Sequence, residues 1–220
     1  MISYPAFSGA GYTPNTLINL IRMKFDYMQN STLEKFSHKK SIPKVIREVT
    51  LKALSFYPEL KNIKIDFVFN EHIRKSVMQA QPRYISMYGR RKWRSYLIKI
   101  SHCFSLKGKK TPIHELPEDV LVGWIGHELG HIIDYLRKNN WSMVLFGISY
   151  ATSKSFIIDA ERVADTYAVD HGLGDYILAT KDFIMHQAGM PEEYIQRIER
   201  LYISPEEIMD LMEDRSSEDD

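Results

Sequence analysis

The feature that most constrains this chain is the run His127-Glu128-Leu129-Gly130-His131, which has the pattern H-E-x-x-H. Two histidines four residues apart lie on one face of a helix, so both imidazoles can reach one metal ion. Zinc suits such ligands, and a catalytic zinc site keeps one coordination position open for water. Glu128 lies about 100° further round the helix than His127, where it can act as a base toward that water. The pattern therefore predicts a metal centre, provided that the helix is buried and a third ligand lies nearby.

The residues around this run predict a long and largely buried helix. Pro117 suits the first helical position, and Glu118 and Asp119 bring negative charge to the first turn, where the helix dipole favours it. Asn139 and Asn140 are expected to end the helix. Apolar residues recur at helical spacing on most sides, namely Val120, Leu121, Trp124, Ile125, Ile132, Ile133 and Leu136.

Three positions of the predicted helix are glycines, Gly123, Gly126 and Gly130. Each glycine weakens a helix by about 1 kcal/mol relative to alanine. Small residues on a buried helix leave room for a close neighbour. We therefore expect another element of the chain, or a substrate, to approach the helix at these positions.

A candidate third ligand lies thirty residues after His131, where Glu161 and Asp165 form the pattern E-x-x-A-D. These two acids are four residues apart and share one helical face. Glu161 can bind the metal while Asp165 accepts a hydrogen bond from the far nitrogen of a ligating histidine, which fixes the tautomer of that ring. The reverse assignment, in which Asp165 is the ligand, stays open. Asp134, three residues after His131, is a further candidate for orienting a ring, or else a charge on the helix surface.

With these two motifs the chain resembles the gluzincin metallopeptidases, and most closely the HtpX and CAAX-prenyl-protease type, whose second motif also ends in Ala-Asp. The resemblance covers roughly residues 118–174, about a quarter of the chain. It implies one zinc ion per chain bound by His127, His131 and Glu161, with Glu128 as the catalytic base and Asp165 supporting a ligand. The implied activity is hydrolysis of peptide bonds in a peptide or protein substrate by zinc-activated water, and we expect an endopeptidase.

Peptide hydrolysis also needs a hydrogen-bond donor that stabilises the developing oxyanion. His171 is the candidate for a transition-state donor, although its position before Gly172 suits a helix cap equally well. Tyr167, Tyr150 and His114 are weaker candidates. The alternative function is a non-catalytic zinc-binding domain that regulates or recognises a partner. The presence of Glu128 argues against this alternative, because a purely structural site has no need of a base.

Composition is that of an ordinary globular protein, with 44% hydrophobic and 26% charged residues in a chain of 220. The net charge of +1 gives no general reason to expect nucleic acid as a partner. The single cysteine, Cys103, excludes an internal disulfide framework and is expected to be a buried thiol in a strand. The first eleven residues show no signal-peptide pattern, and we expect a cytoplasmic protein.

The order of the predicted elements favours an α+β fold, a zincin-like single domain with a short β-sheet beside the motif helix and a helical C-terminal part. Residues 1–58 would be an N-terminal helical region packed on a domain of residues 59–212, followed by an acidic disordered tail at 213–220. The resemblance, together with the order along the chain, implies that strand 96–104 forms one wall of the cleft, where an extended peptide could pair with it. The expected elements are helices at 13–28, 43–57, 155–171, 174–187, 191–202 and 204–212, strands at 63–69, 83–88 and 93–104, and a basic loop at 106–112.

Two further segments are unusual. Residues 141–151 are mostly apolar but too few to span a bilayer, and we interpret them as a buried linker helix, with peripheral contact to a membrane as the alternative. Residues 72–114 contain eleven Lys or Arg and no acid, whereas residues 191–220 contain eleven Asp or Glu and three Arg. We interpret this asymmetry as a basic sheet edge and a solvated tail, and expect no nucleic-acid partner. A nucleic-acid role for the basic segment, and folding of the tail over it, are the alternatives.

Overall fold

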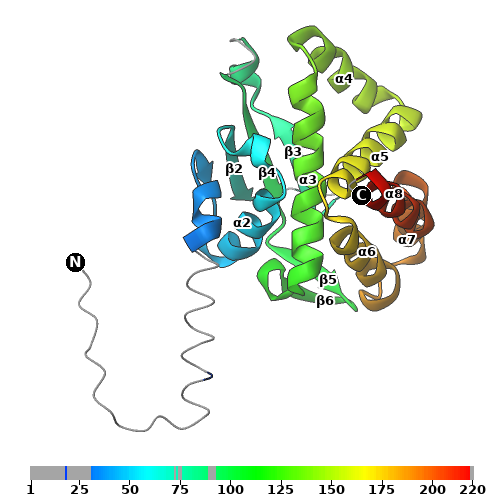
Figure 1. Ribbon diagram of the computed structural model, residues 1–220. Helices are drawn as coiled ribbons and strands as arrows, with labels where there is room; N and C mark the ends of the chain where they lie inside the picture. Colours follow the sequence, from blue (N-terminus) through cyan, green and yellow to red (C-terminus); the bar gives the residue numbers. More distant parts are fainter. Residues whose placement is uncertain (1–17, 19–30, 72, 74–75, 89–92, 219–220) are drawn as a thin grey trace, which may run out of the picture.

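The computed structural model describes residue 18, residues 31–71, residue 73, residues 76–88 and residues 93–218. Within these residues the fold is mixed α+β, with a small sheet on one side and a group of helices on the other (Figure 1). The helix expected at 13–28 lies, apart from residue 18, outside the described residues. No helix of the described part combines the length and the apolar character that crossing a bilayer requires.

The sheet has the strand order β1-β2-β4-β3. Strands β1, β2 and β4 run parallel, and β3 pairs with β4 in the antiparallel sense. A separate hairpin is formed by β5 and β6. The strands are β1 (Lys40–Ser41), β2 (Lys64–Phe69), β3 (Met78–Pro82), β4 (Ser95–Ile100), β5 (Cys103–Leu106) and β6 (Lys109–Pro112).

Seven α-helices make up most of the rest of the described chain, with short 3-10 turns between the N-terminal elements. The α-helices are α2 (Arg47–Ser55), α3 (Glu118–Arg137), α4 (Asn140–Thr152), α5 (Lys154–Asp170), α6 (Gly174–Asp182), α7 (Glu192–Leu201) and α8 (Pro205–Glu218), and a π-helical turn, η7 (Phe183–Gln187), follows α6. The 3-10 helices are η1 (Glu34–Phe36), η2 (Lys44–Ile46), η3 (Pro58–Leu60), η4 (Tyr84–Tyr88) and η6 (Ile113–Glu115).

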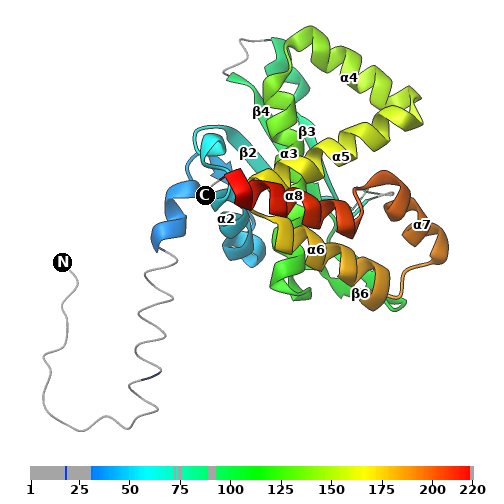
Figure 2. The same cartoon turned by 45° about the vertical axis from the view of Figure 1, so that its right-hand side comes forward.

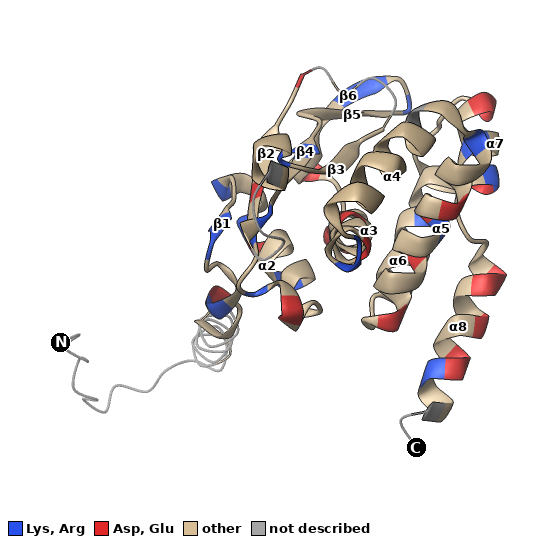
Figure 3. Cartoon of the chain, turned by 90° about the horizontal axis from the view of Figure 1, so that it is seen from above, with Lys and Arg blue, Asp and Glu red and all other residues tan. Residues whose placement is uncertain are grey.

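Helix α3 lies between the sheet and the C-terminal helices, as the view from above shows (Figure 3). Fifteen of its twenty residues are buried, so its polar side chains are largely withheld from water. On the sheet side the core is built by alternating strand residues, of which Ile65, Phe67 and Ile98 are almost fully buried. On the N-terminal side Tyr57 donates a hydrogen bond of 2.7 Å to the carbonyl of Gly126. The helix that carries the motif is therefore the centre of the fold.

The prediction of a strand at 83–88 was wrong. The edge strand lies earlier, at Met78–Pro82, and residues 84–88 form η4. The backbone turns at Arg83, whose carbonyl accepts hydrogen bonds from the amide and the hydroxyl of Ser86. The expected loop at 106–112 is instead the β5–β6 hairpin. Lys107 and Gly108 both have positive φ, as a two-residue type I′ turn requires.

Two expectations about exposure and one about disorder also differ from the structure. Cys103 is exposed rather than buried. Residues 141–151 form most of α4, which buries Met143 but leaves Trp141 exposed. The third expectation, a disordered tail from residue 213, also differs, because α8 continues as far as Glu218. Within this last part of α8, Arg215 donates a hydrogen bond of 3.0 Å to the carbonyl of Val169. This contact ties the acidic end of the chain to α5, which composition alone does not reveal.

The glycines of α3 mark the closest approaches of its neighbours, as we expected from their positions. A Cβ atom on Gly130 would lie 2.4 Å from the carbonyl oxygen of Ala164 in α5. A Cβ atom on Gly123 would lie 2.2 Å from the carbonyl oxygen of Tyr176 in α6. Both distances are too short for any side chain, so α5 and α6 reach their positions only because these residues are glycine.

We predict that Gly130→Ala destabilises the protein by roughly 1–3 kcal/mol, because the added methyl group must push α5 away from α3. Gly147→Ala is the matched control, since Gly147 is exposed on α4 and a Cβ there would meet nothing within 4 Å. This control should be neutral or more stable by up to about 1 kcal/mol, because alanine favours the helix. Urea unfolding followed by circular dichroism measures both. Equal stability of the two variants would contradict the close approach.

Candidate metal centre

His127, His131 and Glu161 meet between α3 and α5 with their ligand atoms facing one another. The Oε2 atom of Glu161 lies 3.1 Å from Nε2 of His127 and 3.5 Å from Nε2 of His131. One ligand atom from each residue lies within 4.8 Å of the others, and all three residues are buried. Two imidazole nitrogens and a carboxylate oxygen are a donor set that first-row transition metals accept. The group could therefore hold a metal ion.

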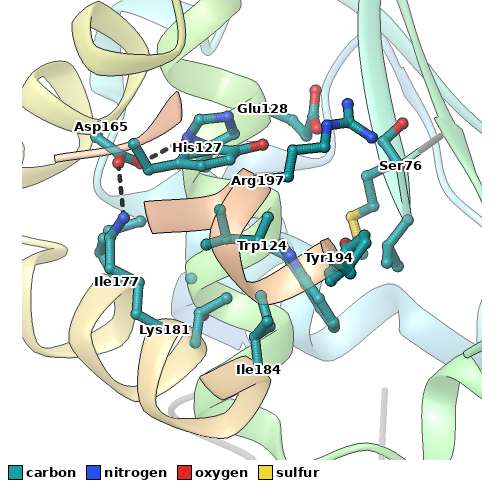
Figure 4. A pocket seen from close by; sticks show the side chains of 16 residues that line it. Ser76, Trp124, His127, Glu128, Asp165, Ile177, Lys181, Ile184, Tyr194 and Arg197 are labelled. Carbon is teal, nitrogen blue, oxygen red and sulfur yellow. Dashed lines mark hydrogen bonds and ion pairs between the residues drawn. The ribbon is translucent and has the colours of Figure 1, made fainter. Parts of the chain in front are cut away.

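Asp165 lies behind His127 rather than among the ligand atoms. Its Oδ1 atom accepts a hydrogen bond of 2.7 Å from Nδ1 of His127, and its Oδ2 atom accepts one of 3.1 Å from Nζ of Lys181 (Figure 4). With the Nδ1 proton held by Asp165, the Nε2 atom of His127 is the nitrogen that faces Glu161. This arrangement fits the expected role of Asp165 as the group that fixes the tautomer of a ligand. Lys181 is an addition that the sequence did not suggest.

Four buried ionisable groups act on one another strongly, namely His127, Glu161, Asp165 and Lys181. Burial by itself lowers the pKa of His127, but the hydrogen bonds and negative charges of Asp165 and Glu161 prevail and raise it to about 10. Burial raises the pKa of Glu161, but the two histidines outweigh burial and hold it well below its usual range. The pKa of Asp165 is likewise lowered, because the charge of Lys181 and the hydrogen bond from His127 exceed the effect of burial. Both carboxyl groups are therefore ionised at neutral pH.

Tyr150 of α4 joins the group from outside the two motifs. Its hydroxyl donates a hydrogen bond of 2.7 Å to Oε1 of Glu161, the oxygen that does not face His127. Sequence analysis gave Tyr150 little weight because nothing in its spacing connects α4 with the motifs. The ring of Phe146, one turn earlier, packs edge-on against Tyr135 of α3 at 5.4 Å and holds α4 in place. The position of Tyr150 thus depends on a contact between helices, which no local pattern reports.

Glu128 faces the edge strand β3. Its Oε2 atom accepts a hydrogen bond of 2.5 Å from the backbone amide of Ala80. Strand β4 lies inside the sheet, paired on both sides by β2 and β3. The expectation that residues 96–104 form the accessible wall was therefore wrong, and β3 borders the site instead. Burial raises the pKa of Glu128, although the nearby histidines partly oppose this effect.

A small cavity of about 50 Å³ opens beside His127 and Glu128. Its walls come from β3, from α3, from α6 and from α7, which covers the site from the side opposite the sheet (Figures 2 and 4). In Figure 4 the side chain of Arg197 on α7 points toward Glu128. The ring of Tyr202, just after α7, lies 5.3 Å from the ring of His127. The sequence gave no sign that α7 contributes to the site.

The remaining candidates lie in other surroundings. The ring nitrogens of His171 contact the carbonyl of Tyr167 at 2.6 Å and Oε1 of Glu59 at 2.7 Å, and its described contacts do not include the three ligand residues. Asp134 forms an ion pair with Lys138. Within the described part of the chain, the Nδ1 atom of His131 has no hydrogen-bond partner, so Asp134 does not orient this ring. His114 lies in η6.

Comparison with protein-family models finds no match, and neither a curated protein nor a solved structure matches it. Any inference about function therefore rests on the motif residues and on the geometry described above.

We predict that Asp165→Asn weakens metal binding about 10–100-fold, because His127 loses the carboxylate that orients its ring. Glu161→Ala, which removes a candidate ligand, should abolish stoichiometric binding. Asp159→Asn is the matched control, since Asp159 is an exposed acid on the same helix. Competition for zinc with a coloured chelator measures all three affinities. An Asp165→Asn affinity equal to that of the control would contradict the assigned role.

We also predict that zinc binding at pH 8 releases about one proton per chain, because the metal must displace the proton from His127. The pKa of His127 is raised to about 10, so this residue is protonated in the metal-free protein at pH 8. In the metal-free protein, the ion pairs of protonated His127 stabilise the fold, and this contribution is complete below about pH 6.5. It declines above that pH and is lost as the pH rises through about 10. Calorimetric titrations in buffers of different ionisation enthalpy count the protons. A count near zero would show that His127 is already neutral.

Proposed function

We propose that the protein is a zinc-dependent metallopeptidase of the gluzincin type, acting as an endopeptidase on a peptide or protein substrate. The observation that carries this proposal is the convergence of His127, His131 and Glu161 on one point, with Glu128 beside them. A purely structural site would need the three ligands but not the neighbouring carboxylate. The E-x-x-A-D pattern, with Asp165 hydrogen-bonded to a candidate ligand, supports the resemblance to the HtpX and CAAX-prenyl-protease type.

His127, His131 and Glu161 would hold zinc and leave one coordination position free. Zinc bound there supplies a Lewis acid that polarises the substrate carbonyl and lowers the pKa of water toward 7. Lys181 and Asp165 hold the ring of His127, and Tyr150 holds the second oxygen of Glu161. These contacts keep the donor atoms aligned without contributing ligands themselves.

Glu128 would serve as the general base. Its raised pKa makes it a better proton acceptor near neutral pH than an ordinary carboxylate, and the amide of Ala80 holds only its Oε2 atom. The Oε1 atom can then take a proton from the attacking water and pass it to the leaving amine. Arg197, which lines the same cavity, is a better-placed oxyanion donor than His171.

The edge strand β3 offers a place for the substrate backbone. Val77 and Arg83 make backbone hydrogen bonds toward β4. The backbone groups of the alternating residues Met78, Ala80 and Pro82 therefore point away from β4, toward the unpaired edge of the sheet. An extended peptide could pair with this free edge next to Glu128. The amide of Ala80 already binds Glu128, and its carbonyl accepts a hydrogen bond of 3.4 Å from the hydroxyl of Tyr135, so pairing would use the carbonyl groups of Met78 and Pro82 most readily.

One observation favours the alternative, a non-catalytic metal-binding domain that recognises a partner. The cavity of about 50 Å³ has room for a few water molecules but not for a peptide. For hydrolysis, α7 has to move away from β3. A domain without turnover needs no such movement.

We predict that Glu128→Gln retains zinc but lowers peptide hydrolysis by about 10²–10⁴-fold, because the amide cannot accept the proton. Elemental analysis measures the metal, and cleavage of an unfolded protein measures the activity. Asp134→Asn is the matched control, since Asp134 lies on the same helix but pairs with Lys138.

Wild-type turnover by Glu128→Gln would refute the role of Glu128. A zinc-loaded wild-type protein that cleaves no unfolded protein or peptide library would favour the partner-recognition alternative.

A further inference from the structure

Helix α7 covers the candidate metal centre from the side opposite the sheet. It forms one wall of the cavity of about 50 Å³ beside His127 and Glu128, and this space has room for a few water molecules but not for a polypeptide. The helix lies at the outer edge of the molecule in both views from the side (Figures 1 and 2). A peptide can therefore reach Glu128 from this side only if α7 moves.

Few side chains attach α7 to the rest of the protein. Two of its ten residues are buried, Ile198 and Leu201. Within the described part of the chain, one continuous cluster of buried apolar side chains forms the core, and none of its members lies on α7. Because α7 contributes nothing to this cluster, it can separate from the site while the core stays intact.

Ile198 is the buried residue of α7 that lines the site, and its surroundings are loosely packed. It borders both the small cavity and a second cavity of about 550 Å³. Leu178 of α6 and Met185 of η7 line this second cavity from the other side. A side chain bordered by cavities has fewer neighbouring atoms than one in a close-packed core, so Ile198 holds its helix less firmly than a core residue would.

The chain on both sides of α7 is anchored. Before the helix, Ala188 belongs to the core cluster, and its carbonyl accepts a hydrogen bond of 2.7 Å from the β5–β6 hairpin. After the helix, Ile203 belongs to the same cluster, and Ser204 and Glu207 cap α8 through reciprocal hydrogen bonds of 2.8 and 3.2 Å. Gly189, with a φ of +61°, directly follows the first anchor and suits a hinge.

We propose that residues 190–202, which we call the α7 gate, close the metal centre against polypeptides and swing outward between their two anchored ends to admit a substrate. This inference rests on the proposed peptidase function and supplies its regulation. Opening also withdraws Arg197 from Glu128, because α7 carries Arg197 (Figure 4). The fraction of molecules with an open gate then limits the apparent activity, so the closed protein is largely latent.

Thiol labelling measures the opening and needs neither metal nor hydrolysis. In a Cys103→Ser background, which removes the one cysteine of the chain, Ile184→Cys places a thiol in the wall of the small cavity. Val169→Cys is the matched control, since Val169 is similarly buried but belongs to the core cluster and lines neither cavity. We expect dithionitrobenzoate to label the Ile184→Cys protein at least about tenfold faster, because local opening is easier than unfolding of the core.

Truncation of Ile198 tests the contact that keeps the gate closed. Ile198→Ala should raise the labelling rate of the Ile184→Cys protein roughly tenfold, because less apolar surface is exposed on opening. In the otherwise unchanged, zinc-loaded chain it should raise hydrolysis of an unfolded protein by a similar factor. Ile195→Ala is the matched control, since it makes the same change on the same helix at a half-buried residue that lines neither cavity. Circular dichroism establishes that all variants are folded.

The outcomes separate the gate from the peptidase function. Labelling of Ile184→Cys no faster than that of Val169→Cys would overturn the gate, as would equal labelling rates after Ile198→Ala and Ile195→Ala. Faster labelling with no hydrolysis by any variant would support the gate and count against the peptidase function. Hydrolysis by the wild type without faster labelling would overturn the gate and leave the peptidase function standing.

Discussion

The close approach of α5 to α3 at Gly130 is the constraint on which the candidate metal centre depends. The carbonyl of Ala164 occupies the space that a side chain on Gly130 would fill. This approach brings Glu161 to the two histidines and Asp165 to the far side of His127. A glycine that costs the isolated helix about 1 kcal/mol thus makes possible a contact between four buried ionisable groups.

The helical motifs could be predicted because their information is local. A spacing of four residues puts His127 over His131, and Glu161 over Asp165, whatever the rest of the fold does. The mixed α+β class and most helix positions followed from the same periodicity. What brings the two motif helices together is a tertiary contact, which was expected from the need for a third ligand and from the glycines in α3.

Other parts of the structure leave little trace in the sequence. Strand β3 has few β-branched or aromatic residues, and it is extended because it pairs with β4 and because Glu128 binds the amide of Ala80. The exposed side of α4 could not be told from its buried side, since both are apolar. Tyr150 and Lys181 reach the centre from helices outside the motifs, and no spacing connects them with it.

The presence of Lys181 beside Asp165 has a consequence for electroneutrality. Three carboxylates, those of Glu128, Glu161 and Asp165, share a buried region with one ammonium group. Lys181 offsets one of these three negative charges, and the guanidinium of Arg197, which points toward Glu128, offsets a further part. Lys181 thereby lowers the positive charge that a bound metal ion must supply to this buried region. A histidine that holds a proton in the absence of metal reduces the same imbalance.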